Sequence, residues 1–312
     1  MSLKIIASKI LTKSPSDIID GDLIELEEAI KCCSIDELDE LWRSEGYSLL
    51  MMTVKAGQVD IIRLLYPHFL NDYRADKLCV QLLKLALFRK QEEVAKVLLN
   101  FGVYLNADTQ HSILLLACDN LEIMTMLMER GIDINTIGYS LNTRRFDTCL
   151  HIACRNGNLE MMQLLSMYGA DANLHREGIH PPIVDACIAN QIDAIRLLLA
   201  KGADINITEG QYGAIHMTPL SIACDRGYVD LVRLLLEHGA YANATDSSGD
   251  TPLIHTLRCS SQPNLECIQL LLEYGADVSI VNTDGYTALE YVDKNTEIAH
   301  MILNSQLERV LK

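Results

Sequence analysis

Apolar residues recur along most of the chain at the three- and four-residue spacing of amphipathic helices. In one clear unit the spacing predicts a short helix over residues 220–226 and a second helix over 229–238. Thr218 followed by Pro219 is a typical start for the first helix, because the threonine oxygen can cap it and proline has a fixed φ. Gly227 suits the left-handed residue that ends that helix. The pattern therefore predicts a pair of helices joined by a tight turn.

This helix pair returns at nearly constant intervals. One equivalent apolar position is occupied at spacings of 33, 37, 33 and 36 residues by Leu150, Ile183, Leu220, Leu253 and Leu289. The clearest units span residues 112–135, 147–173, 180–206, 217–243 and 250–279, and a shortened terminal unit spans 285–303. A single unit cannot bury its own apolar faces, so we expect neighbouring units to stack on one another.

The pattern becomes weaker towards the start of the chain. Degenerate units cover residues 80–106 and 48–69, and Pro67 is expected to stop the second helix of the latter. Helices are also predicted over 22–33 and 35–42. We therefore divide the chain into residues 1–46, an N-terminal helical cap or a further degenerate repeat, and residues 47–312, a continuous repeat array.

The conserved letters of the units resemble the ankyrin repeat. A Thr-Pro-Leu start, an Ala-Cys pair, a Gly-containing turn, a run of leucines and a Gly-Ala-Asp-x-Asn ending recur, each with some departures, in the four adjacent units 147–173, 180–206, 217–243 and 250–279. The resemblance implies an all-α solenoid of about eight helix-pair units with hairpin-like fingers and an N-terminal helical cap. It also implies a scaffold or adaptor that binds a partner protein through its concave face and extended fingers, without catalysis.

Charge and composition exclude several other classes of partner. The chain carries 26 basic and 42 acidic residues, a formal net charge of −16. Such a chain repels phosphate backbones and acidic membrane surfaces, so we expect neither nucleic-acid nor membrane binding. No apolar stretch approaches the ~18 residues of a membrane span. We expect a monomeric, cytoplasmic protein.

Ten cysteines would favour disulfides in a small secreted chain, but their placement here favours free thiols. Four of them follow an alanine in the same position of successive units: Cys118, Cys154, Cys187 and Cys224. Stacked helices lie about 8–10 Å apart, whereas the Cα atoms of a disulfide are rarely more than about 7 Å apart. We therefore predict small, buried, reduced side chains. The chain has no Cys-x-x-Cys pair, so neither a metal nor a cofactor is expected.

Catalytic motifs are missing from the sequence, and we predict that the protein is not an enzyme. No phosphate-binding glycine loop, nucleophile elbow or zinc-protease motif occurs. The ankyrin resemblance implies that His151 orders its turn through backbone hydrogen bonds. Three alternatives stay open: a Cys–His hydrolase site assembled in space, an enzyme inhibitor, and a secreted bacterial effector that binds a host protein in the host cytosol.

The candidate partner-binding residues lie where the sequence departs from the packing motif. Two fingers are overlong, at 136–146 and 207–216, and both carry aromatic side chains in a chain with few of them. Their candidate residues are Tyr139, Arg144, Arg145, Phe146, Tyr212 and His216, because tyrosine and arginine are enriched in binding hot spots. The alternative is that the aromatics only stabilise the loops. The concave face implied by the resemblance adds the inner-helix positions Arg155, Asn156, Ile188, Asp225 and Arg226.

Overall fold

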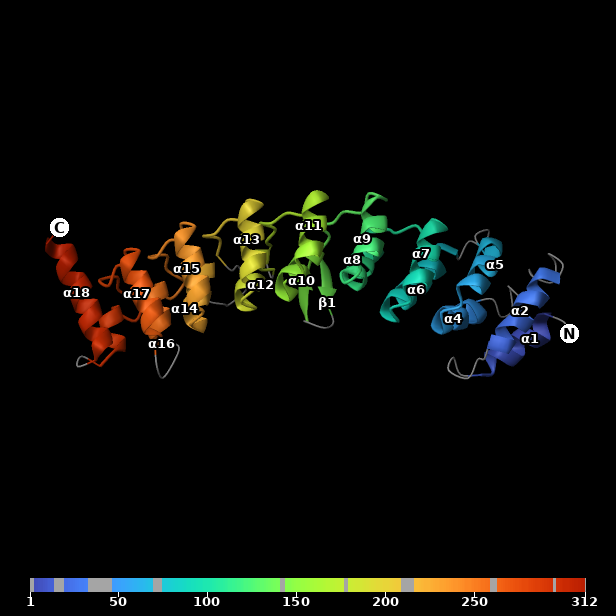
Figure 1. Ribbon diagram of the computed structural model, residues 1–312, viewed down its shortest axis with the longest axis horizontal. Helices are drawn as coiled ribbons and strands as arrows, with labels where there is room; N and C mark the ends of the chain where they lie inside the picture. The colour runs from blue at the N-terminus through green and yellow to red at the C-terminus, as the bar shows by residue number, and fades with distance from the viewer. Residues whose placement is uncertain are drawn as a thin grey trace. The chain divides into compact units, whose positions relative to one another are not determined.

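Antiparallel helix pairs make up most of the computed structural model (Figure 1). It describes residues 3–13, 20–32, 47–69, 75–140, 144–176, 179–208, 216–258, 263–293 and 296–311. Contacts divide the chain into two compact units, Met1–Gly138 and Tyr139–Lys312, each of which is described by itself. Within the described ranges, no helix combines the length and the apolar character that crossing a bilayer requires.

The first unit is built from successive helix pairs. They are α1 (Leu3–Leu11) and α2 (Asp20–Cys32), α4 (Tyr47–Ala56) and α5 (Val59–Phe69), α6 (Ala75–Phe88) and α7 (Glu92–Asn100), and α8 (Ala107–Ala117) and α9 (Leu121–Met128). Helix α1 contacts α2 and α4, and α2 contacts α5, so the first pair stacks on the second. The helix predicted over 35–42 lies outside the described residues.

The prediction that Pro67 stops its helix is wrong. Helix α5 continues through Pro67 to Phe69. Proline removes one backbone hydrogen bond and its ring crowds the carbonyl four residues earlier, but it stands near the end of the helix, where few further bonds depend on it. The buried side chains Leu65 and Tyr66 just before it hold this last turn against the core.

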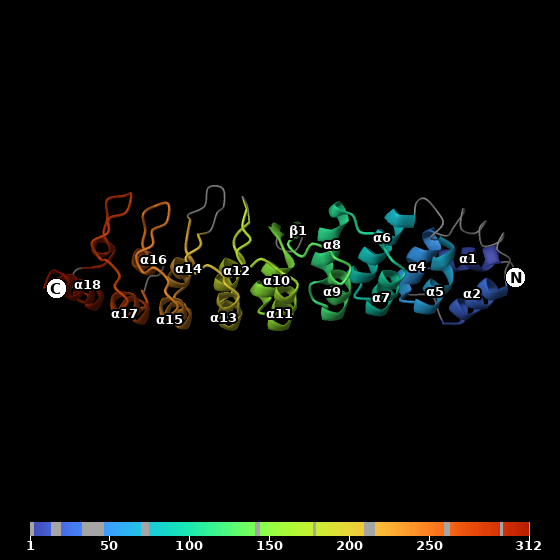
Figure 2. The same ribbon diagram turned by 90° about the horizontal axis from the view of Figure 1, so that it is seen from above.

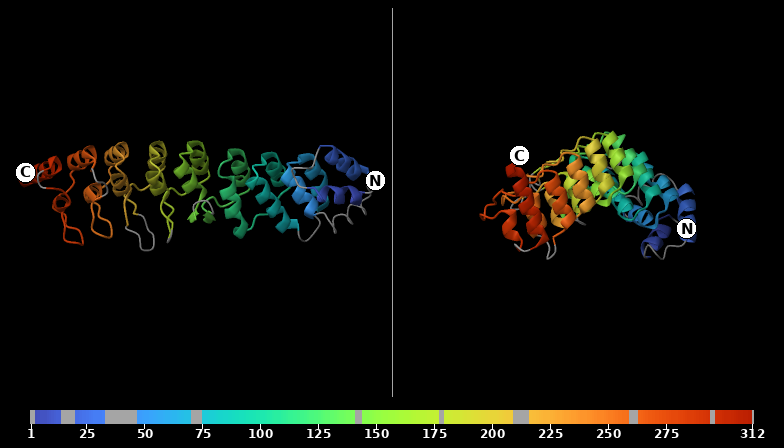
Figure 3. Two further views of the ribbon diagram at one scale, coloured as in Figure 1. Left: turned by 90° about the horizontal axis from the view of Figure 1, so that it is seen from below. Right: turned by 60° about the vertical axis from the view of Figure 1, so that its left-hand side comes forward.

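The second unit begins within a two-stranded hairpin and continues as helix pairs. Its elements are β1 (Gly138–Ser140), β2 (Arg145–Asp147), α10 (Cys149–Asn156), α11 (Leu159–Met167), α12 (Pro182–Ile188), α13 (Ile192–Ala200), α14 (Pro219–Arg226), α15 (Val229–Glu237), α16 (Pro252–Arg258), α17 (Leu265–Glu273), η3 (Ala288–Tyr291) and α18 (Glu297–Leu311). The inner helices α10, α12, α14 and α16 pack in sequence order. Loops such as those after α15 and α17 project to one side of this unit, away from the outer helices (Figures 2 and 3).

The helix signals read from the sequence are confirmed in this unit. The Thr218 hydroxyl accepts a hydrogen bond from the backbone N–H of Ser221 at 3.2 Å, and helix α14 starts at Pro219. Gly227 ends α14 with a φ of 66°, in the left-handed region. The aligned cysteines of this unit, Cys154, Cys187 and Cys224, are free and buried, as predicted, and so is Cys118 in the first unit. They pack where the inner helices contact their neighbours, because a thiol is small and apolar.

Neighbouring units from 147 to 279 are joined by an asparagine side chain that makes two hydrogen bonds to the backbone of the next unit, called here an asparagine bracket. Asn173 accepts a hydrogen bond from the backbone N–H of Asp204 at 2.7 Å and donates one to the carbonyl of Gly202 at 2.9 Å. The same two kinds of bond are made by Asn206 to the backbone of Gly239 and Tyr241, and by Asn243 to that of Gly275 and Asp277. Each bracket thus fixes the start of the next finger by main-chain contacts.

Candidate functional site

Two short strands pair where the second unit begins, and residues 138–140 and 144–147 are defined here as the hairpin finger. Strands β1 and β2 pair within it. The rings of Tyr139 and Phe146 meet edge to face with centroids 5.3 Å apart. Both side chains stay about half exposed, at 47% and 51%. The aromatic residues therefore support each other while presenting apolar surface to solvent.

Arg144 occupies an unusual backbone position at the base of the hairpin turn. Its φ is 54°, and its side chain is exposed. A side chain other than glycine, asparagine or aspartate in the left-handed region costs about 1 kcal/mol. A strained residue that gains no packing is a reason to look for a functional role at that position.

A network of buried charges lies beneath the hairpin finger. Arg155, at the end of α10, donates to the carboxylates of Asp147 at 3.0 Å and of Asp185 at 3.1 Å. Arg145, from β2, contacts the ring of His180 and lies 3.8 Å from Asp185. Both aspartate side chains are almost fully buried, at 3% and 2% exposure. The two arginines therefore hold strand β2 against α10 and α12.

This network corrects the sequence interpretation of Arg155. The sequence places Arg155 among the partner-binding positions of the concave face, but its side chain is 23% exposed and forms two ion pairs within the chain. Arg145 is also engaged by residues of its own unit, whereas Arg144 is exposed. The two neighbouring arginines thus have different environments: Arg145 lies in strand β2 and reaches Asp185, whereas Arg144 precedes the strand in the left-handed conformation.

Asp185 is a residue that the sequence analysis missed. It occupies the inner-helix position at which the neighbouring units have Ile152 and Ile222. Its Oδ1 atom takes the contacts from the arginines, and its Oδ2 atom has no hydrogen-bond partner among the described residues. An acid at a position that is isoleucine in both adjacent units was the signal that could have revealed it.

His151 orders its turn as predicted. Its Nδ1 atom accepts the backbone N–H of Thr148 at 3.2 Å, and its Nε2 atom donates to the carbonyl of His180 at 2.6 Å. Burial lowers the pKa of His151, which favours the neutral ring with one donor and one acceptor. His151 therefore links two successive units.

The other predicted residues are distributed over the second unit. Asn156 and Arg226 are exposed, and Ile188 and Asp225 are half-buried. His216 is exposed beside α14, whereas Tyr212 lies outside the described residues. The structure brings together Tyr139, Phe146, Arg145 and Arg155 around the hairpin finger.

A second buried polar cluster, in the finger before α16, has the residue types of a metal site. Asp246, Asp250 and His255 have ligand atoms within 4.8 Å of one another. Asp246 accepts bonds from the backbone N–H of Asp250 and from His255 at 2.9 Å each, and Asp250 binds Asn282 and Arg258. Because partners within the chain use all four carboxylate oxygens, the cluster is explained as a brace between this finger and α16.

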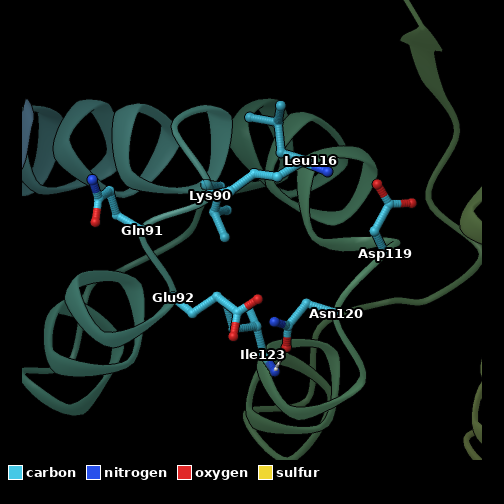
Figure 4. A pocket seen from close by; sticks show the side chains of 8 residues that line it. Lys90, Gln91, Glu92, Leu116, Asp119, Asn120 and Ile123 are labelled. Atoms are coloured by element: carbon cyan, nitrogen blue, oxygen red, sulfur yellow. Dashed lines mark hydrogen bonds between the residues drawn. The ribbon is translucent and has the colours of Figure 1, made fainter. Parts of the chain in front are cut away.

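A cavity of about 130 Å³ lies in the first unit between the turns of two neighbouring helix pairs (Figure 4). Between the Ala-Cys pair and the second helix, the unit of α8 (Cys118 to Leu121) has two residues fewer than the unit of α10 (Cys154 to Leu159). Leu116 and Ile123 contribute apolar surface, while Lys90, Glu92 and Asp119 bring both signs of charge (Figure 4). This mixture favours neither an anion nor a cation.

The buried thiols do not favour nucleophilic chemistry. Burial raises the pKa of Cys154, Cys187 and Cys224, and raises that of Cys267 to about 11. The thiolate is the reactive form, so these four groups are protonated and weakly nucleophilic at neutral pH. They suit packing rather than covalent catalysis.

Ankyrin repeats are what this chain resembles in comparisons with both a family model and solved structures. The family model for ankyrin repeats (three copies) matches residues 136–209 and 211–282. The crystal structure of the human ASB11 ankyrin repeat domain aligns with a TM-score of 0.56 and 26% identity, over 72% of this chain and 96% of that one.

Two curated relatives are similar over part of their length. A putative ankyrin repeat protein of fowlpox virus (strain NVSL) is 26% identical over 200 residues, which are 63% of this chain and 49% of the relative. The human protein phosphatase 1 regulatory subunit 27 is 36% identical over 85 residues, 24% of this chain and 55% of the relative. The chain thus spans about half the length of these two relatives.

Proposed function

Because the chain belongs to the ankyrin-repeat family, we propose that it is a non-catalytic adaptor that binds a partner protein through its hairpin finger. Ankyrin repeats are typical protein-interaction scaffolds. The observation that carries the proposal is the exposed pair of Tyr139 and Phe146, which contact each other on paired strands. Exposed aromatic residues that already support each other give large contact area at a small cost in conformational entropy.

The surroundings of this pair define the chemistry of the partner. Arg144, two residues before Phe146 in the chain, adds an exposed positive charge to the hairpin finger of a chain whose net charge is −16. The complementary surface is an apolar side chain with an acidic neighbour. Arg145 and Arg155 keep the hairpin finger in place through Asp185, so we assign them a positioning role rather than direct contact.

Quantitative affinity capture from cells that make the native protein tests this proposal. The unaltered chain and a Tyr139→Ser/Phe146→Ser variant are used as baits, and captured proteins are compared by mass spectrometry. We expect the specific partner to fall by at least about tenfold with the variant, as for the loss of a hot spot.

Tyr104→Ser is the matched control, because Tyr104 is 69% exposed but lies in the first unit. It should capture the partner as the unaltered chain does. Equal capture by the hairpin-finger variant, with an unchanged circular dichroism spectrum, would overturn the proposal.

The monomeric state and the cytoplasmic location stay predictions.

A further inference from the structure

Tyr241 occupies a position at which the sister units have an aspartate. In those units the carboxylates of Asp171, Asp204 and Asp277 accept the backbone N–H of the residue two positions later, at 2.8, 2.9 and 2.9 Å. A tyrosine ring cannot make this bond, and Tyr241 is 67% exposed. Neither the local turn nor core packing accounts for the aromatic side chain.

Tyr241 shares a surface groove of about 510 Å³ with a second exposed tyrosine. The groove is lined by the side chains of Ala240, Tyr241, Ala242, Asn243, Ala244 and Tyr274. Ala240 and Ala242 are buried, and Tyr274 is 46% exposed. Small residues between two aromatic rings leave room for a flat, apolar ligand segment to lie on the rings.

Hydrogen bonding within the groove limits what can bind. The side-chain amide of Asn243 donates to the carbonyl of Gly275 at 3.1 Å and accepts the backbone N–H of Asp277 at 2.6 Å. Both ends of that amide are therefore committed to the fold, which leaves the tyrosine hydroxyls as the side-chain donors of the groove. The groove therefore suits a ligand that accepts a few hydrogen bonds from these hydroxyls and has few donors of its own.

A proline-rich segment has these properties. Proline has no backbone N–H, and its polyproline II helix exposes carbonyl oxygens between flat apolar rings. Aromatic-lined grooves are a recurrent way to bind such segments, because the helix is already formed before binding and loses little entropy.

Charge beside the groove adds a second requirement. Glu237 and Glu273 are the exposed last residues of α15 and α17, close in sequence to Tyr241 and Tyr274. They favour a positive charge on the ligand. We propose that this groove binds a proline-rich segment of a partner protein with an arginine or lysine beside the prolines. Its residues are separate from the hairpin finger.

Fluorescence anisotropy of a labelled peptide of consecutive prolines flanked by arginine tests the proposal with the full chain. We expect saturable binding to the unaltered protein. Tyr241→Asp, which places the residue of the sister units in this turn, should weaken binding by at least about tenfold and leave the melting temperature equal or higher. Tyr168→Ala is the matched control, because Tyr168 caps α11 as Tyr274 caps α17, and it should bind the peptide unchanged.

Three results would overturn the proposal: no saturable binding to the unaltered chain, full affinity in Tyr241→Asp, or equal affinity for a glycine–serine peptide with the same arginines. The last result would identify charge alone as the attraction. A Tyr139→Ser/Phe146→Ser chain should bind the peptide normally, so failure of the hairpin finger as a partner site and failure of the groove are distinguished.

Discussion

The guanidinium group of Arg155 lies 3.0 Å from the carboxylate of Asp147, eight residues earlier in the chain. Arg258 and Asp250 form a pair with the same separation in the unit of α16. In both units an arginine near the end of the inner helix forms an ion pair with an aspartate at the end of the preceding finger. The ion pair therefore ties each finger to the helix of its own repeat.

Removing Arg155 should destabilise the second unit strongly. In Arg155→Ala the carboxylates of Asp147 and Asp185 stay buried and lose their shared cation. An uncompensated buried charge costs about 3 kcal/mol or more. Urea denaturation followed by circular dichroism should show this decrease in the free energy of unfolding.

Arg226→Ala is the matched comparison, since Arg226 also ends an inner helix but is exposed. Its loss should cost less than about 0.5 kcal/mol. Equal stability of the two variants would show that the buried pairs contribute nothing to the fold.

Gly157→Ala should be less stable than the same change at another left-handed glycine. Gly157 has a φ of 65°, and a methyl group there would lie 2.8 Å from Cδ of Gln191 in the next unit. Gly169 has a φ of 84° with no atom near enough to be touched. Both variants carry the backbone strain, and only Gly157→Ala must also displace the end of the flexible Gln191 side chain, which should cost less than about 1 kcal/mol. Thermal unfolding of the two variants measures the difference.

A second substitution separates the contact from the strain. The double variant Gly157→Ala/Gln191→Ala should lose as much free energy of unfolding as Gly169→Ala and Gln191→Ala lose when their separate losses are added. If Gln191→Ala does not relieve any of the stability lost in Gly157→Ala, then the backbone strain of the turn alone explains that loss.

Stability should fall as the pH falls through about 6.5, partly because of His151. Burial lowers the pKa of His151 in the native state, so below about pH 6.5 the unfolded chain binds a proton that the native chain does not. This difference lowers the free energy of unfolding by at most about 1.4 kcal/mol per pH unit for one proton. Melting temperatures measured from about pH 7.5 to 5.5 should fall less steeply in His151→Gln. Identical pH slopes would mean that His151 does not contribute.

The regular parts of the fold were predictable because their signals are local. Thr218, Pro219 and Gly227 act on the backbone next to them, so the limits of α14 follow from a few adjacent residues. The stacking followed from the repetition of such units. Pro67 was misjudged because its effect depends on the packing of Leu65 and Tyr66, which one sequence does not display.

The polar network could not be predicted in the same way. The bond from Arg155 to Asp185 joins residues 30 positions apart, and Arg145 reaches Asp185 from a strand that the repeat pattern does not contain. The sequence predicted which finger departs from the motif, but not which of its two arginines faces inward. Tyr241 was visible as an aromatic residue in an aspartate position, but its neighbour Tyr274 comes from the next unit.

The asparagine brackets separate what holds the units together from what the units display. Asn206 accepts its hydrogen bond from the backbone N–H of Tyr241, and Asn243 accepts the equivalent bond from Asp277. A main-chain donor is the same whichever side chain it carries. The side chain at this position can therefore change from acidic to aromatic during evolution without loosening the joint, and new binding specificity can arise one residue at a time on an unchanged frame.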